Sequence, residues 1–214
     1  MHGQSIVKAC LEITGQDVTP HLRNVDASGR TDRYIVNELL RRCGIAPTDI
    51  NRVFDEVAAR SVELTTVGLA EADRGWVLPG ARMLLEALCE ANIAVGLVTG
   101  NLPKIATVKL ACAEIWEPFA KQVPLIAGFG DLSEDRNDLA HAALAQARDH
   151  LDRHLVAEHV VVIGDTPRDV ECAQAIGACC IAVATGSYSA ENLQSTKAEY
   201  VVDSLEALLP GVKV

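Results

Sequence analysis

The run Val160-Val161-Val162-Ile163-Gly164-Asp165-Thr166-Pro167-Arg168-Asp169 says most about the architecture of this chain. Its four β-branched residues predict a buried strand, and Gly-Asp-Thr-Pro predicts a sharp turn into a helix. Asp165 and Asp169 would then stand together at the carboxyl end of the strand. Two such oxygen donors suit Mg²⁺, which binds one or two carboxylates together with waters and substrate phosphate.

The same residues also permit a purely structural interpretation. Thr166 could be the N-cap of the helix, Pro167 its first residue and Asp169 the acid of a capping box. The motif alone favours neither interpretation, and the two are compatible.

Helices and strands alternate on both sides of this run. An apolar stretch at 93–98 ends at Thr99-Gly100-Asn101. The other strand candidates are 125–127, 180–184 and 200–202, and the helix candidates are 81–91, 103–113, 137–151 and 204–209. This alternation predicts an α/β fold with a Rossmann-like parallel sheet covered by helices on both faces. Ligands bind such sheets at the carboxyl ends of the strands.

Residues 1–78 show a different pattern. Apolar residues recur at helical spacing and no strand is evident, with breaks near 15–20, 27–29 and 44–47. We therefore expect a small helical unit at 1–78 and the α/β core at 79–214.

The composition argues against several classes of function. The 214 residues are 49% hydrophobic and carry a net charge of −10, which is typical of a globular protein and argues against a nucleic-acid surface. There is no apolar run of the roughly 20 residues that span a bilayer, and Met1-His2-Gly3-Gln4 does not begin a secretory signal. Seven cysteines without a C-x-x-C favour reduced, buried thiols in a cytoplasmic protein. We expect no membrane partner.

Two further segments could carry chemistry. Thr99-Gly100-Asn101 offers a hydroxyl, a close backbone approach and an amide, which together could cradle a phosphate. The alternative is a turn in which Asn101 caps the next helix. Arg136 could clamp a phosphate, although Glu134-Asp135-Arg136-Asn137-Asp138 also reads as a solvated charge run.

Taken in order, T-G-N, a cation before a helix and G-D-T-x-x-D resemble motifs of the haloacid dehalogenase-like hydrolases. The resemblance covers about residues 78–190. The helical region is similar to the cap of that family, and Gly29-Arg30-Thr31-Asp32 resembles a cap motif of its phosphoglycolate phosphatase-like members.

The resemblance implies a Mg²⁺-dependent phosphatase that hydrolyses a small phosphomonoester through an aspartyl-phosphate. It assigns the metal to Asp165 and Asp169, phosphoryl binding to Thr99 and the Gly100 and Asn101 amides, charge neutralisation to Arg136, and a substrate contact from the cap to Arg30. Arg136 would replace the usual lysine of the family, and a surface arginine is the simpler interpretation of Arg30.

The chain departs from the family at its first motif, D-x-D-G-[TS], which supplies the nucleophile. It contains no D-x-D, and Val25-Asp26-Ala27-Ser28-Gly29 follows no strand. We expect a chain that begins roughly 15 residues late, without its first strand and loop; the alternative is a relative that has lost the nucleophile.

The absent strand would be central, between the strands that end at Thr99 and Asp165. Its absence predicts an apolar slot, poor stability and no phosphatase activity. The rival functions are a non-catalytic protein that binds a phosphate or a partner, and a phosphosugar mutase.

Overall fold

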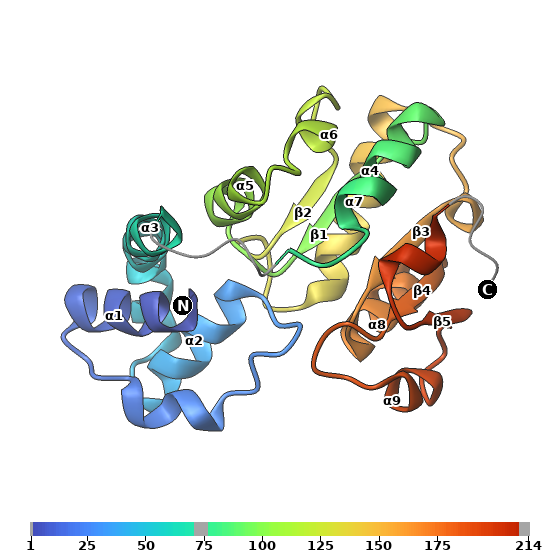
Figure 1. Cartoon of the computed structure of the whole chain (residues 1–214). Coiled ribbons are helices and arrows are strands. Elements are labelled where there is room, and N and C mark those ends of the chain that lie inside the picture. Colours follow the sequence, from blue (N-terminus) through green and yellow to red (C-terminus); the bar gives the residue numbers. More distant parts are fainter. Residues whose placement is uncertain (1, 71–76, 210–214) are drawn as a thin grey trace.

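The structure is a computed structural model that describes residues 2–70 and 77–209. Its N-terminal region is helical, as predicted (Figure 1). The elements are α1 (His2–Thr14), the 3₁₀-helix η1 (Thr19–Asn24), α2 (Asp32–Arg42) and α3 (Pro47–Ala70). Gly15, Gly29 and Gly44 have φ between 65° and 81° in the connections, a conformation that favours glycine.

The helical region has its own apolar core. α1 and α2 both pack against α3. The core extends into the α/β part, because it contains residues of the segment that begins α5 as well as of α1 to α3; its largest fully buried side chains include Ile6, Leu39, Leu40, Ile50 and Ile105. The two parts of the chain therefore share one continuous hydrophobic cluster.

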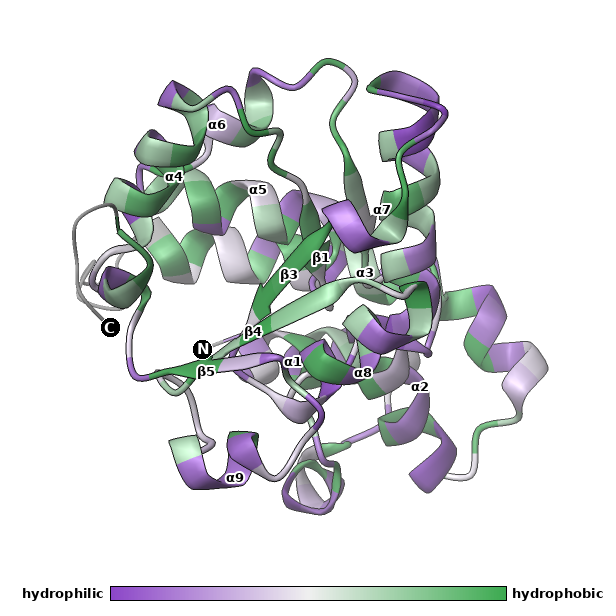
Figure 2. Cartoon of the chain, turned by 90° about the vertical axis from the view of Figure 1, so that its right-hand side faces the viewer, coloured by the Kyte–Doolittle hydropathy of each residue, from purple (hydrophilic) through white to green (hydrophobic). Residues whose placement is uncertain are grey.

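The α/β part alternates as the sequence predicts. Its helices are α4 (Ala81–Glu90), α5 (Pro103–Cys112), α6 (Glu117–Ala120), α7 (Arg136–His150), α8 (Pro167–Ile176) and α9 (Ala190–Gln194), with 3₁₀-helices η2 (Ala157–His159) and η3 (Leu205–Leu208). Its strands are β1 (Leu97–Thr99), β2 (Ala127–Phe129), β3 (Val161–Gly164), β4 (Cys179–Val183) and β5 (Tyr200–Val202). Figure 2 shows the apolar strands in the middle, with helices around them.

Some boundaries differ from the prediction. The strand predicted at 93–98 is limited to Leu97–Thr99, and Ile93 is exposed outside the sheet. The strand predicted at 125–127 begins at Ala127 and contains Gly128, where a Cβ would lie 2.0 Å from the Leu139 carbonyl oxygen. A glycine weakens a strand pattern in sequence, but here it allows α7 to approach β2 closely. The predicted terminal helix is the 3₁₀-helix η3.

The described strands form two parallel sheets, β1-β2 and β3-β4-β5. α7 packs on β1 and β2, α8 packs on β3 and β4, and the two helices contact each other. The α7–α8 contact therefore holds the two sheets together. In the described ranges, no helix is both long and apolar enough to cross a membrane.

β1 and β3 are edge strands of their sheets. Cys179 N donates to the Val160 carbonyl at 3.0 Å, so the alternate residues Val161 and Ile163 direct their backbone groups away from β4. The two residues are 51% and 38% exposed. No described strand lies between β1 and β3, as expected for a sheet that lacks a central strand.

We expect the backbone amides of Val161 and Ile163 to exchange hydrogen almost as fast as unprotected amides, because no neighbouring strand accepts from them. The amides of Leu97 and Cys179, which donate to Ile126 and Val160, are matched controls and should be protected. Residue-resolved hydrogen exchange measures both sets. Equal protection at all four sites would contradict the split sheet.

The substitution Gly128→Ala should destabilise the protein by about 1–3 kcal/mol, because the new Cβ would overlap the Leu139 carbonyl. Gly3→Ala is the control: it lies in α1, nothing is within 4 Å of the added Cβ, and alanine favours a helix by about 0.5–1 kcal/mol. Urea unfolding of both variants tests this. A Gly128→Ala variant as stable as the parent would show that α7 does not approach β2 as described.

Candidate active site

A cavity of about 380 Å³ lies between the helical region and the carboxyl ends of β1 and β3. All the residues predicted to carry chemistry line it: Arg30, Thr99, Gly100, Asn101, Arg136, Asp165 and Asp169. They come from segments far apart in the sequence, and the parallel strands bring them to one edge.

Thr99, Gly100 and Asn101 form a tightly held turn after β1. Asn101 N donates to Thr99 Oγ1 at 3.2 Å, and Gly130 N donates to the Asn101 carbonyl at 2.9 Å. The expected alternative, Asn101 as helix cap, is wrong, because α5 begins at Pro103 with Leu102 at the N-cap.

Gly100 has a role that the sequence did not reveal. A Cβ there would lie 2.1 Å from the Arg30 carbonyl oxygen, and Asp32 N donates to the Gly100 carbonyl at 2.7 Å. This glycine therefore lets the backbone of the helical region lie directly on the turn after β1.

The structural interpretation of Asp169 is confirmed. Its Oδ2 accepts from Thr166 N at 3.0 Å and from Thr166 Oγ1 at 2.8 Å, and the two residues form a capping box at the start of α8. Asp169 is only 6% exposed. Its other oxygen, Oδ1, accepts from Arg136 Nη2 at 2.8 Å.

Asp165 differs from Asp169 because the described residues form no ion pair with it. Burial raises the pKa of the Asp165 carboxyl, and the nearby Asp169 raises it further. Asp165 Oδ2 also lies against Gly186, where a Cβ would be 2.0 Å away. The position of Gly186, after β4, gave no signal in sequence because its role depends on this tertiary contact.

The donor set fits Mg²⁺. A divalent cation would relieve the repulsion between the Asp165 and Asp169 carboxylates, whose oxygens are hard ligands. The described residues contain no group of three or more His, Cys, Asp or Glu side chains that could enclose a metal ion. Mg²⁺ usually keeps several waters and binds substrate phosphate, so Asp165 as ligand with the Asp169 carboxylate nearby is sufficient.

Arg136 lies between the ends of the two edge strands. Its Nη2 donates to the Val98 carbonyl at 3.1 Å, on the free edge of β1, and its Nη1 donates to the Gly29 carbonyl at 3.3 Å. Its Nε is buried without a partner. Arg136 is thus no residue of a solvated charge run, and it contacts β1, α8 and the helical region together.

Arg30 is no ordinary surface arginine. It is half-buried, its guanidinium carbon lies 4.3 Å from the centre of the Tyr34 ring, and its Nε is buried without a partner. Unpartnered buried donors are costly, and two of them at one cavity favour an anionic ligand.

A pair of residues that the sequence did not single out, the partly buried His2 and the buried Asp32, lines the same cavity. His2 Nε2 lies 2.8 Å from Asp32 Oδ1, and Asp32 Oδ2 accepts from Leu102 N at 2.8 Å. Asp32 is 2% exposed. Asp32 belongs to the segment that resembles a cap motif, but the 30 positions between it and His2 gave no signal of a contact.

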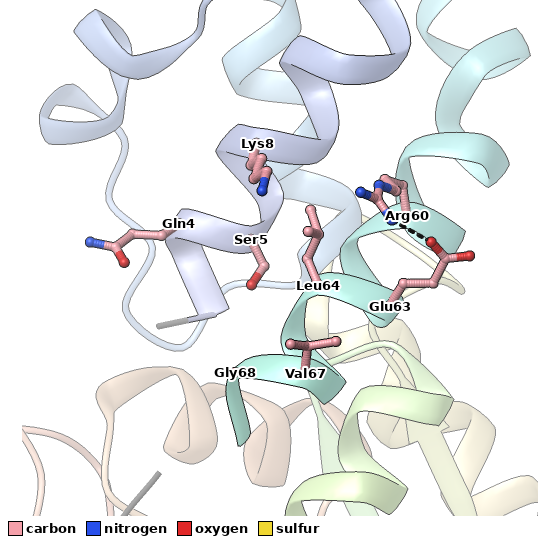
Figure 3. A pocket seen from close by; sticks show the side chains of 8 residues that line it. All are labelled: Gln4, Ser5, Lys8, Arg60, Glu63, Leu64, Val67 and Gly68. Carbon is pink, nitrogen blue, oxygen red and sulfur yellow. Dashed lines mark hydrogen bonds and ion pairs between the residues drawn. The ribbon is translucent and has the colours of Figure 1, made fainter. Parts of the chain in front are cut away.

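A second hollow, of about 390 Å³, lies between α1 and α3 (Figure 3). Its cations are already paired: Arg60 contacts Glu63 at 2.6 Å and Glu12 at 2.5 Å, and Lys8 lies 3.9 Å from Glu12. None of the residues predicted to carry chemistry lines it. The cavity at the strand ends is therefore the candidate site.

Part of the chain matches a known protein family in sequence. Residues 137–208 match the HAD-hydrolase-like family model. No curated protein matches the chain in sequence.

Solved structures resemble almost the whole chain. β-Phosphoglucomutase from Clostridium difficile is 20% identical with a TM-score of 0.67, and the match covers 98% of this chain and 86% of that one. CbbY from Rhodobacter sphaeroides, solved in complex with phosphate, is 17% identical with a TM-score of 0.68 over 100% and 92% of the two chains. A predicted phosphatase from Clostridium acetobutylicum is 18% identical with a TM-score of 0.66 over 96% and 87%.

These likenesses concern the fold, and the family model concerns the C-terminal part of the core. The family model includes the G-D-T-x-x-D segment at 164–169 and begins after the T-G-N segment at 99–101. The chain thus has the fold of the haloacid dehalogenase-like hydrolases and matches their family model over its C-terminal third, which confirms the resemblance predicted from its motifs.

Proposed function

We propose that the cavity binds the phosphate group of a small phosphomonoester together with Mg²⁺, as in a phosphoglycolate phosphatase-like enzyme. The observation that carries the proposal is the meeting of Thr99, Arg136 and the Asp165–Asp169 pair at one cavity. The unpartnered Nε atoms of Arg30 and Arg136 support an anionic ligand.

Each residue has a distinct task in this proposal. Thr99 and the Gly100 amide would donate to phosphoryl oxygens, and Asp165 would hold the metal ion. Asp169 would keep Thr166 and Arg136 in place, since both of its oxygens already accept hydrogen bonds. Bound Mg²⁺ would supply charge neutralisation at the phosphate.

The helical region would act as the cap. It already contacts the rim of the cavity through Asp32 N to the Gly100 carbonyl, and through Arg33 N to the Gly130 carbonyl at 3.0 Å. Arg168 in α8 adds a contact from the core, because its Nη2 lies 2.8 Å from Asp26 Oδ2. A cover of this kind excludes water and suits a small substrate.

The aspartates that line the cavity determine whether it contains a nucleophile for phosphate hydrolysis. Asp32 and Asp169 have both oxygens engaged, and the proposal assigns Asp165 to the metal ion. None of these three, which are the aspartates among the described lining residues, is left as a nucleophile. We therefore propose binding without turnover for these 214 residues, so a non-catalytic relative is the second candidate. A phosphosugar mutase stays the alternative enzyme, by likeness to β-phosphoglucomutase.

All seven cysteines are free in the structure. Burial raises the pKa of Cys10 and Cys180 to about 12, which keeps both thiols protonated and unreactive at neutral pH. We propose a reducing, cytoplasmic location on this basis.

Mg²⁺ should raise the affinity of the protein for inorganic phosphate by at least about tenfold, or about 1.4 kcal/mol. Asp165→Asn should abolish this effect, because it removes the proposed metal ligand. Asp203→Asn, at an exposed position, is the matched control and should behave like the parent. Calorimetric titration with phosphate, with and without Mg²⁺, measures all three proteins. A Mg²⁺ effect that survives in Asp165→Asn would remove Asp165 from the metal site.

The 214-residue chain should release no phosphate from 2-phosphoglycolate or p-nitrophenyl phosphate, because Asp32 and Asp169 are engaged and Asp165 is assigned to the metal ion. A colorimetric phosphate assay with Mg²⁺ tests this, and Asp165→Asn gives the background. Mg²⁺-dependent release above that background would refute binding without turnover.

A further inference from the structure

Lys109 lies directly behind the turn that follows β1. It belongs to α5, is partly buried, and its Nζ donates to Asn101 Oδ1 at 2.5 Å. No described residue forms an ion pair with it. Burial lowers the pKa of Lys109 and the nearby Asp32 raises it, so the buried ammonium depends on the field of that carboxylate. Nothing in the sequence drew attention to this lysine.

The ammonium determines which way the Asn101 carboxamide faces. A lysine ammonium has three donors and no acceptor, so only the oxygen of the amide can face it. The backbone of Asn101 is fixed as well, by Thr99 Oγ1 at its N–H and by Gly130 N at its carbonyl. The side chain therefore has one defined orientation, with Nδ2 directed away from Lys109.

The Nδ2 group of Asn101 can donate hydrogen bonds to a ligand. Among the described residues, none accepts a hydrogen bond from it, and it is not one of the buried side-chain atoms without a partner. Asn101 lines the cavity. Two amide donors at this point complement the acceptor oxygens of a phosphoryl group, whereas a flipped amide would present its oxygen and repel them.

Asp32 makes the arrangement possible. It is buried, and its own oxygens are fixed by His2 and by the backbone of Leu102. Its negative charge partly offsets the effect of burial on the pKa of Lys109. The helical region thus supplies a charge that favours the protonated form of this core lysine.

We infer that Lys109 is a positioning residue of the phosphate site, which holds the Asn101 carboxamide with its N–H donors toward the ligand. The inference rests on the proposed function for the identity of the ligand. The orientation of the amide is a separate property that can be measured without any ligand.

The test is Lys109→Met, which preserves the length of the side chain and removes the donor. Lys104→Met is the matched control, because Lys104 lies exposed on the same helix. We expect the NMR resonances of the Asn101 side-chain NH₂ group to shift or broaden in Lys109→Met and to stay unchanged in Lys104→Met. With Mg²⁺ present, the affinity for inorganic phosphate should fall about tenfold in Lys109→Met only.

Asn101→Asp keeps the partner of Lys109 and replaces the cavity-facing donors by an acceptor. It assigns the NH₂ resonances by their disappearance, and it should melt no lower than the parent but bind phosphate at least about tenfold more weakly. If Lys109→Met does not fold, Asn101→Asp still tests whether the side-chain donors of Asn101 bind phosphate. Parent-like phosphate binding by Asn101→Asp would overturn the inference.

The outcomes separate the inference from the proposed function. If the parent and Lys104→Met both fail to bind phosphate, the proposed function fails, and the NH₂ resonances alone decide the role of Lys109. Unchanged resonances in Lys109→Met would overturn that role, and so would altered resonances together with parent-like phosphate affinity. Altered resonances with weakened phosphate binding support it.

Discussion

The guanidinium of Arg136 satisfies acceptors from three parts of the molecule, and the arrangement around the cavity depends on it. It reaches the Val98 carbonyl on the free edge of β1, Asp169 at the start of α8 and the Gly29 carbonyl of the helical region. Because the Arg136 and Asp169 side chains are 16% and 9% exposed, little solvent screens their ion pair. A planar guanidinium fork can span these acceptors, which the single ammonium group of a lysine could not do in the same geometry.

Close contacts at glycines also hold the parts around the cavity together. Glycines allow them at three interfaces: Gly100 under the Arg30 carbonyl, Gly128 under the Leu139 carbonyl, and Gly186 beside the Asp165 carboxylate. Each contact places a chemical group at the cavity or a helix on its sheet. The free edges of β1 and β3 are the opposite case, since no described strand covers them, and Val161 and Ile163 are accordingly exposed.

Much of this was readable from the sequence. The β-branched run before Asp165 and the turn after it predicted β3 and α8 closely, because local pattern and tertiary placement agree there. The gap beside β1 was predicted from the lack of a D-x-D motif. The features that the sequence did not predict depend on tertiary contacts. Gly128 interrupts the strand pattern of β2, and Asp169 is engaged by Arg136, which belongs to α7. The roles of His2, Asp32 and Lys109 arise only where the helical region meets the core.

The central claim is that a phosphate group and Mg²⁺ bind where β1 and β3 end. A crystal structure of the 214-residue protein grown with Mg²⁺ and inorganic phosphate tests it most directly. The account predicts phosphate within hydrogen-bonding distance of Thr99 and Asn101, with a cation on Asp165. Phosphate bound instead in the hollow between α1 and α3, or a cavity at the strand ends that stays without both ions, would contradict it.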